Sequence, residues 1–256
     1  MAKTKDKNEW GSNLSFLLAM IGSAVGLGNI WRYPYVLYSN GGGAFFIPYI
    51  VAILIMGIPF LILEYGVGYN FKSSFPKAVK SISKKWEYLG WFLPVAVFMI
   101  LIYYSAILGW DGFYVIISAF KGWGADPNAY FTGSFLQAND TLGGLGTFVP
   151  FVAIAMLVGW VIMWVISHTD LEKGLGRVSK VLVPLLFAIM IFIVLFSLTL
   201  PGAGIGLAEL YNPDWSLLLN FNIWMAAFGQ MIFSLSLGMS IAFTYASYTK
   251  DDSDLV

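Results

Sequence analysis

The stretch Gly22-Ser23-Ala24-Val25-Gly26-Leu27-Gly28-Asn29 decides how this 256-residue chain folds. It interrupts an apolar segment, with residues 14–21 before it and 30–38 after it. Each glycine costs a helix about 1 kcal/mol relative to alanine and leaves the backbone unshielded. Non-helical backbone at membrane depth persists only where it is buried in protein or lines a cavity. The stretch therefore predicts a membrane-crossing helix that breaks at its midplane, where transporters form ion and substrate sites. A glycine-rich face for helix packing is the alternative.

Composition restricts the class of protein. Hydrophobic residues make up 59% of the chain and charged residues 11%, and the mean hydropathy is +0.76. Soluble domains carry about 25% charged residues, so an ordinary soluble domain is excluded. The chain has no cysteine, which excludes disulfides, thiol nucleophiles and sulfur-ligated metal sites. Its formal net charge is zero, and nothing in it points to a nucleic-acid partner.

The apolar pattern predicts an all-α integral membrane protein that forms a single transmembrane domain over residues 1–256. A helix needs about 20 apolar residues to cross a bilayer. Segments of that kind lie at about 13–38, 44–70, 88–120, 146–167, 178–200 and 217–247. We also expect tryptophans near the span ends to form an aromatic belt at the membrane interfaces. These are Trp10, Trp86, Trp91, Trp123 and Trp215.

Positive charges predict the orientation of these spans. All but two of the 14 lysines and arginines fall in segments that six crossings place on one side, and the exceptions are Lys121 and Arg32. The positive-inside rule makes that side cytoplasmic. We therefore expect both ends of the chain in the cytoplasm and the protein in the plasma membrane, or in the inner membrane of a bacterium.

Four motifs, in order along the chain, resemble the neurotransmitter:sodium symporter family. The first helix of that family is matched by Trp10-Gly11-Ser12 and residues 22–35, the second by residues 40–45 and 58–64, the third by Tyr103-Tyr104 and the sixth by residues 229–238. The resemblance implies the LeuT-type fold, an inverted repeat of five plus five helices, with helices 1 and 6 unwound at the midplane. This chain matches only the first six of about twelve helices. We expect a truncated chain whose partner is the missing helices 7–12, with a native six-helix protein as the alternative.

The resemblance implies sodium-coupled secondary active transport of an amino acid by alternating access. A channel is a weaker reading, because broken helices suit an occluded site better than an open pore. An intramembrane enzyme is disfavoured, since the sequence has neither His-Glu-x-x-His nor Gly-x-Ser-x-Gly. A six-helix scaffold or membrane subunit that does not transport remains the alternative if the native chain ends here.

Two sodium sites follow from the break and the resemblance. Breaking the first span exposes the carbonyl of Ala24 and lets Asn29 offer its side-chain oxygen to a cation. The resemblance adds Ser234 to this first sodium site and leaves the substrate carboxylate to complete it. Gly22 and Val25 match carbonyl ligands of a second sodium. The alternative role of Asn29 is an interhelical hydrogen bond.

For the substrate, the amides of Leu27 and Gly28 start the outer half-helix, whose positive dipole end favours a carboxylate. The resemblance adds the hydroxyl of Tyr104. It also makes Gly26 informative, because relatives that carry biogenic amines have an aspartate there. We therefore expect an amino acid with a bulky apolar or aromatic side chain. The substrate-binding residues so implied are Ala24, Gly26, Leu27, Gly28, Ile100, Tyr104, Ile107, Phe233, Ser234, Ser236 and Met239.

The resemblance also implies an outer gate and an anion site. Arg32 and Phe233 match the gate, and the acidic partner of Arg32 is expected on helix 10. Three residues match the chloride site of chloride-dependent relatives, namely Tyr49, Gln230 and Ser234. Glu64, inside the second span, is expected to accept hydrogen bonds from amides that the helix breaks release.

Overall fold

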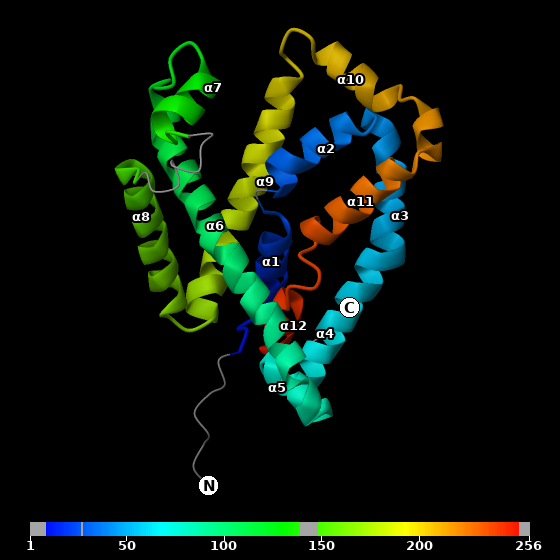
Figure 1. Cartoon of the computed structure of the whole chain (residues 1–256), viewed down its shortest axis with the longest axis vertical. Coiled ribbons are helices and arrows are strands. Elements are labelled where there is room, and N and C mark those ends of the chain that lie inside the picture. Colours follow the sequence, from blue (N-terminus) through cyan, green and yellow to red (C-terminus); the bar gives the residue numbers. More distant parts are fainter. Residues whose placement is uncertain (1–8, 27, 139–147, 251–256) are drawn as a thin grey trace. The chain divides into compact units, whose positions relative to one another are not determined.

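A computed structural model describes residues 9–26, 28–138 and 148–250 of the chain. All regular structure in these residues is helical (Figure 1). The α-helices are α1 Asn13–Ala24, α2 Tyr33–Ser39, α3 Phe46–Ala52, α4 Ile58–Phe71, α5 Phe75–Ile82, α6 Glu87–Ala119, α7 Pro127–Ala129, α8 Pro150–Ser167, α9 Arg177–Ser197, α10 Ala203–Tyr211, α11 Phe221–Ser234 and α12 Ile241–Ser247. The short 3₁₀ and π segments are η1 Gly28–Arg32, η2 Gly42–Phe45, η3 Ile53–Gly57, η4 Lys84–Trp86, η5 Tyr130–Phe135, η7 Glu172–Gly176 and η8 Trp215–Leu219.

Several helices are long and apolar enough to cross a membrane. Among the described residues there are four, Gly42–Phe71, Lys84–Ala119, Pro150–Ser167 and Glu172–Ser197. The pair Asn13–Ala24 and Gly28–Ser39, whose halves are bent by 51°, makes a fifth by length and composition if the two halves form one span. The segment expected to cross at about 217–247 is divided between α11 and α12.

The chain divides into two compact units. One comprises Met1–Pro94 and Asp170–Val256, and the other comprises Val95–Thr169. In the second unit α8 meets α6 at Gly109, where a Cβ would lie 2.9 Å from the backbone nitrogen of Met156. An aromatic cluster, in which the rings of Phe113 and Phe135 stack 5.2 Å apart, joins α6 to η5 in this unit.

The first unit contains both broken spans, and its core holds α11 against η2 and α3. Ala44 and Phe45 pack there on Ile223 and Ala227, all at most 3% exposed. Farther along, Ala52 and Met231 form a second buried cluster with Leu237, which lies just after α11. Both clusters lie beside α11, whose end at Ser234 marks the break in the sixth span.

Gly68 in α4 is explained by the close approach of two backbones. A Cβ on Gly68 would lie 2.2 Å from the carbonyl oxygen of Phe243, so only glycine lets α12 pack on α4 at this point. Lys72 follows in the left-handed region (φ 43°) and donates to the carbonyl of Thr249. The second half of the sixth span, α12, is therefore held to α4 in the second span.

One tryptophan does not lie where the belt rule places it. Trp86 and Trp215 are 51% and 56% exposed, as residues of a belt should be. Trp10 is only 3% exposed. Its indole nitrogen donates to the carbonyl of Tyr245 at 2.9 Å, and its backbone nitrogen donates to that of Tyr248 at 3.0 Å. The belt interpretation of Trp10 is therefore wrong, because this side chain is a packing contact between the start of the chain and α12.

Candidate functional site

The first span breaks within the glycine-rich stretch. α1 ends at Ala24, where the N–H of Val25 still donates to the carbonyl of Ile21 at 2.7 Å. Helical structure resumes at Gly28, the first residue of η1. The break leaves the carbonyls at the end of α1 and the amides at the start of η1 outside regular helical pairing. Leu27, whose amide is expected to bind substrate, lies outside the described residues.

The sixth span breaks between α11 and α12. Ser236, Gly238 and Ser240 all have left-handed backbone conformations, with φ of 51°, 71° and 56°. Such conformations stop a helix, and non-glycine residues rarely adopt them. The amide of Gly238 donates to Oε1 of Glu64 at 2.8 Å. The expectation that Glu64 accepts a hydrogen bond from a released amide is therefore confirmed.

Oxygen atoms from the two breaks gather at one place. Nδ2 of Asn29 donates to the carbonyl of Ala24 at 2.6 Å, and the hydroxyl of Ser234 donates to Oδ1 of Asn29 at 2.5 Å. The hydroxyl of Ser236 donates to the carbonyl of Ser23 at 3.3 Å. The first sodium site was predicted at Ala24, Asn29 and Ser234, and these residues bring three oxygen atoms together. Hard cations take oxygen ligands, so the chemistry of this donor set fits sodium.

The two carbonyl residues predicted for a second sodium lie beside α9. Gly22 and Val25 line a hollow of about 380 Å³ together with residues of that helix, among them Val183. A Cβ on Gly22 would lie 3.0 Å from Cγ2 of Val183, so α1 and α9 are in close contact here. The role of Gly22 and Val25 remains a prediction.

The two residues predicted to form a gate, Arg32 and Phe233, contact each other. The guanidinium of Arg32 lies 5.2 Å from the ring centroid of Phe233 and donates to Oε1 of Gln230. The Phe233 ring lies against the backbone of Gly28, because a Cβ on Gly28 would lie 1.8 Å from Cε1 of that ring. Phe233 therefore lies at the start of η1, where the substrate carboxylate is expected.

Two of the three residues predicted for chloride, Gln230 and Ser234, are hydrogen-bonded to each other. Gln230 is fully buried and its Nε2 donates to the hydroxyl of Ser234 at 3.1 Å. Tyr49 packs its ring 5.0 Å from that of Tyr33 and 5.9 Å from that of Phe45. Tyr49 also lies beside the buried cluster that supports α11. Their role in anion binding stays a prediction.

Part of the predicted site lies in the other unit. Ile100, Tyr104 and Ile107 belong to α6 in the unit Val95–Thr169. Their roles, like that of Met239 in the broken segment 235–240, remain predictions.

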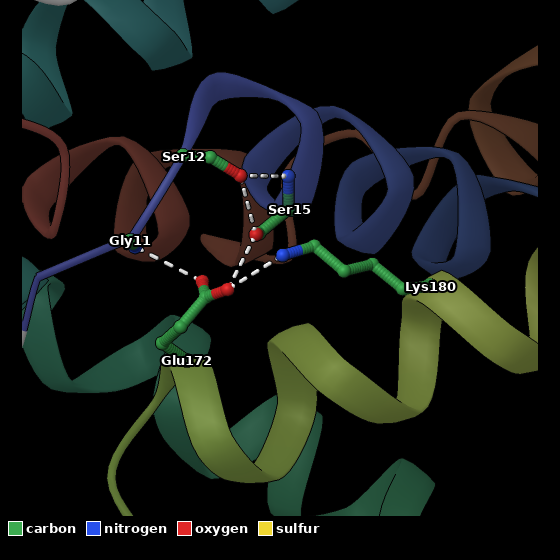
Figure 2. A network of polar contacts seen from close by, with 5 residues as sticks. All are labelled: Gly11, Ser12, Ser15, Glu172 and Lys180. Atoms are coloured by element: carbon green, nitrogen blue, oxygen red, sulfur yellow. Dashed lines mark hydrogen bonds and ion pairs between the residues drawn. The ribbon is translucent and has the colours of Figure 1, made fainter.

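Two contacts were missed by sequence reasoning. The first is Gln230 as a partner of Arg32, for which an acidic residue on helix 10 was expected. Gln230 precedes Ser234 by four positions and so shares its helix face, which places it beside a predicted sodium ligand but does not mark it as the partner of Arg32. The second is the hydrogen-bonded carboxylate of Glu172, shown in Figure 2, which no motif marks.

Comparisons with known proteins identify the family. The model of the sodium:neurotransmitter symporter family matches residues 7–140 and 123–256. An uncharacterised sodium-dependent transporter of Methanocaldococcus jannaschii is 44% identical over 98% of this chain and 51% of its own length. The uncharacterised sodium-dependent transporter YhdH of Bacillus subtilis is 35% identical over 94% and 52%.

A solved structure agrees with the fold. The crystal structure of MhsT in complex with L-phenylalanine superposes with a TM-score of 0.80 at 36% identity, and covers 97% of this chain and 55% of MhsT. The chain spans about half the length of the curated relatives it matches. These relatives are transporters and not enzymes. With its LeuT-type helices broken in the first and sixth spans, this chain belongs to the sodium:neurotransmitter symporter family.

Proposed function

We propose that this chain carries half of the transport site of a sodium-coupled amino-acid symporter, with a bulky apolar or aromatic amino acid as substrate. The observation that supports this most directly is the meeting of Ala24, Asn29 and Ser234 oxygens from two broken spans. Two interrupted helices that face each other with neutral oxygens provide cation ligands without a fixed negative charge. The substrate carboxylate supplies that charge.

The carboxylate is expected at the start of the outer half of the first span. Gly28 begins this half, and free amides together with the positive end of the helix dipole favour an anion there. Gly26 leaves room for the carboxylate, whereas an aspartate at this position would repel it. Tyr104 donates its hydroxyl to the same group in this proposal. Sodium and amino acid thus complete each other's site, which is the physical basis of coupled transport.

The side-chain pocket supports an apolar substrate. Its proposed lining is Ile100, Ile107, Phe233, Ser236 and Met239. Most of these side chains are apolar, and methionine adapts to different shapes. The similar MhsT was solved with L-phenylalanine, which agrees with an aromatic substrate. Chloride at Tyr49, Gln230 and Ser234, a second sodium at Gly22 and Val25, and cytoplasmic ends in the plasma or inner membrane belong to the same proposal.

The test is equilibrium binding of radiolabelled L-phenylalanine to the complete gene product, whatever its length, in sodium and in potassium. We expect saturable binding in sodium that unlabelled apolar amino acids displace and that dopamine and serotonin do not. Binding that is equal in potassium would refute the sodium coupling. Displacement by the amines would refute the substrate class.

A further inference from the structure

The carboxylate of Glu172, at the start of η7, is held by three donors, two of which, Gly11 and Ser15, lie at the start of the chain (Figure 2). Oε2 accepts a hydrogen bond from the backbone nitrogen of Gly11 at 2.9 Å. Oε1 accepts one from the hydroxyl of Ser15 at 2.8 Å and pairs with Nζ of Lys180 at 2.7 Å. The carboxylate therefore ties the entry of the first span to the helix that leads into α9.

Two glycines, Gly11 and Gly176, leave the space that the side chain of Glu172 occupies. A Cβ on Gly11 would lie 2.7 Å from Cγ and Cδ of Glu172, and a Cβ on Gly176 would lie 2.9 Å from Oε2. Glycines thus border the carboxylate on both sides, and a larger residue at either position would displace it. The side chain of Glu172 still keeps 31% of its surface exposed, so water can replace its partners when they separate.

The network extends into the N-terminal cap of α1. Ser12 is the N-cap, and its hydroxyl accepts from the backbone nitrogen of Ser15 at 3.2 Å. The two serine hydroxyls lie 2.8 Å apart. Ser15 has one hydroxyl proton and donates it to Glu172, so Ser12 is the donor of the pair. A carboxylate near this helix end is also favoured by the helix dipole.

The helix held by this network, α1, is separated by the break from the rest of the first span. α1 has twelve residues, ends at the break, and packs on α9, η7 and α12. A helix cut from its continuation can move as a rigid body if its other contacts release, in the manner of a hinged element. On the side of η7 and α9, the Glu172 network holds α1 through the hydrogen bond from Ser15, and holds the residues before α1 through that from Gly11.

We propose that Glu172 is a positioning residue: a latch that holds the inner half of the first span against η7 and α9, and that opens when cargo is released to the cytoplasm. The inference rests on the proposed transport function and adds a residue that the sodium and substrate sites do not use. Lys180 neutralises the latch, and Gly11 and Ser15 connect it to the moving helix.

The first test needs no substrate. Hydrogen–deuterium exchange of the peptide covering residues 13–24 is compared in the complete gene product and in its Glu172→Gln variant. We expect exchange to be faster by about tenfold in the variant, the factor for one lost charge-assisted hydrogen bond in the closed state. Ser15→Ala, which removes one donor from the other side, should act in the same direction, and it serves if Glu172→Gln folds poorly.

Glu87→Gln is the matched control. Glu87 pairs with Lys80 at 2.9 and 3.0 Å and is 38% exposed, close to the 31% of Glu172. Its ion pair joins α5 to the start of α6 and not to α1. We expect exchange of residues 13–24 to be unchanged in this variant. Equal rates in Glu172→Gln and Glu87→Gln would overturn the latch.

A transport readout separates the latch from simple stabilisation. A weakened latch lowers the population open to the outside, so the KM for external amino acid should rise by about tenfold while the maximal rate is kept. A loss of maximal rate at unchanged KM would overturn the role in release. If the parent protein shows no sodium-dependent uptake, the proposed function fails, and the exchange experiment still decides whether Glu172 holds α1.

Discussion

The hydroxyl of Ser234 lies 2.5 Å from Oδ1 of Asn29, although the two residues are 205 positions apart. Asn29 lies just after the break in the first span, and Ser234 is the last residue of α11 before the break in the sixth. Their contact joins the two unwound segments through polar groups. It places the proposed sodium ligands and the gate on one connected set of residues, because Ser234 also contacts Gln230, the partner of Arg32.

Removing the Asn29 side chain should weaken sodium binding. Asn29→Ala deletes one cation ligand and leaves the Ala24 carbonyl without its donor, so we expect sodium affinity to fall at least about tenfold. Asn70→Ala is the control, since Nδ2 of Asn70 also donates to a backbone carbonyl, that of Gly66 at 2.7 Å, but outside the site. Titration of amino-acid binding with sodium measures both. Unchanged sodium affinity in Asn29→Ala would remove Asn29 from the site.

A charge at position 26 should change the substrate class. In Gly26→Asp the new carboxylate repels the substrate carboxylate, and we expect amino-acid binding to weaken by more than about tenfold. Gly26→Ala adds bulk without charge and should weaken binding less. Competition by amines that lack a carboxylate is the sensitive measurement, because they should gain affinity in Gly26→Asp alone. Equal losses in the two variants would show that space, and not charge, matters there.

The close contact of Gly28 with the gate predicts a steric effect. A methyl group in Gly28→Ala would meet the Phe233 ring at 1.8 Å and must displace it. We expect amino-acid affinity to fall by about tenfold, the effect of a misplaced contact in a binding site. Gly229→Ala, on α11 itself, meets nothing within 4 Å and is the control. If both variants bind like the parent, Phe233 does not close over the substrate.

A matched pair of glycine variants in α4 tests how α12, the second half of the sixth span, packs on α4. Gly68→Ala would bring a methyl group within 2.2 Å of the Phe243 carbonyl, whereas Gly66→Ala meets nothing within 4 Å. Overpacking of this kind costs about 1–3 kcal/mol. Thermal unfolding in detergent should show a lower midpoint for Gly68→Ala and an unchanged or higher midpoint for Gly66→Ala. A shared midpoint would mean that α12 does not pack on α4 as described.

The sequence predicts the breaks better than it predicts contacts between helices. Glycine spacing at 22–29 indicates the first break from backbone chemistry alone, and the fold follows from the family motifs. The contact of Ser234 with Asn29 has no local signal, since neither periodicity nor composition relates positions so far apart. It is expected only because the motifs match a known family.

Residues outside the motifs show what the sequence leaves open. Trp10 reads as an interfacial residue because tryptophan at a span end usually lies in the headgroup region. Trp10 is instead buried, and its indole and backbone N–H groups donate to the carbonyls of Tyr245 and Tyr248. The tertiary packing of α12 decides where these carbonyls lie. From the sequence, Glu172 has no feature that separates it from a solvated loop charge. Its hydrogen bonds with Gly11 and Ser15 appear only in the structure. Such contacts depend on the docking of whole helices, which single-residue patterns do not encode.

The measurement that tests the shared site most directly is reciprocal coupling between sodium and amino acid in the complete gene product. If the Ala24, Asn29 and Ser234 oxygens and the substrate carboxylate bind one sodium together, L-phenylalanine must tighten sodium binding by the same factor by which sodium tightens L-phenylalanine. We expect a factor of at least about tenfold in both directions, lost in Asn29→Ala. Sodium and amino-acid affinities that are independent of each other would contradict the shared site.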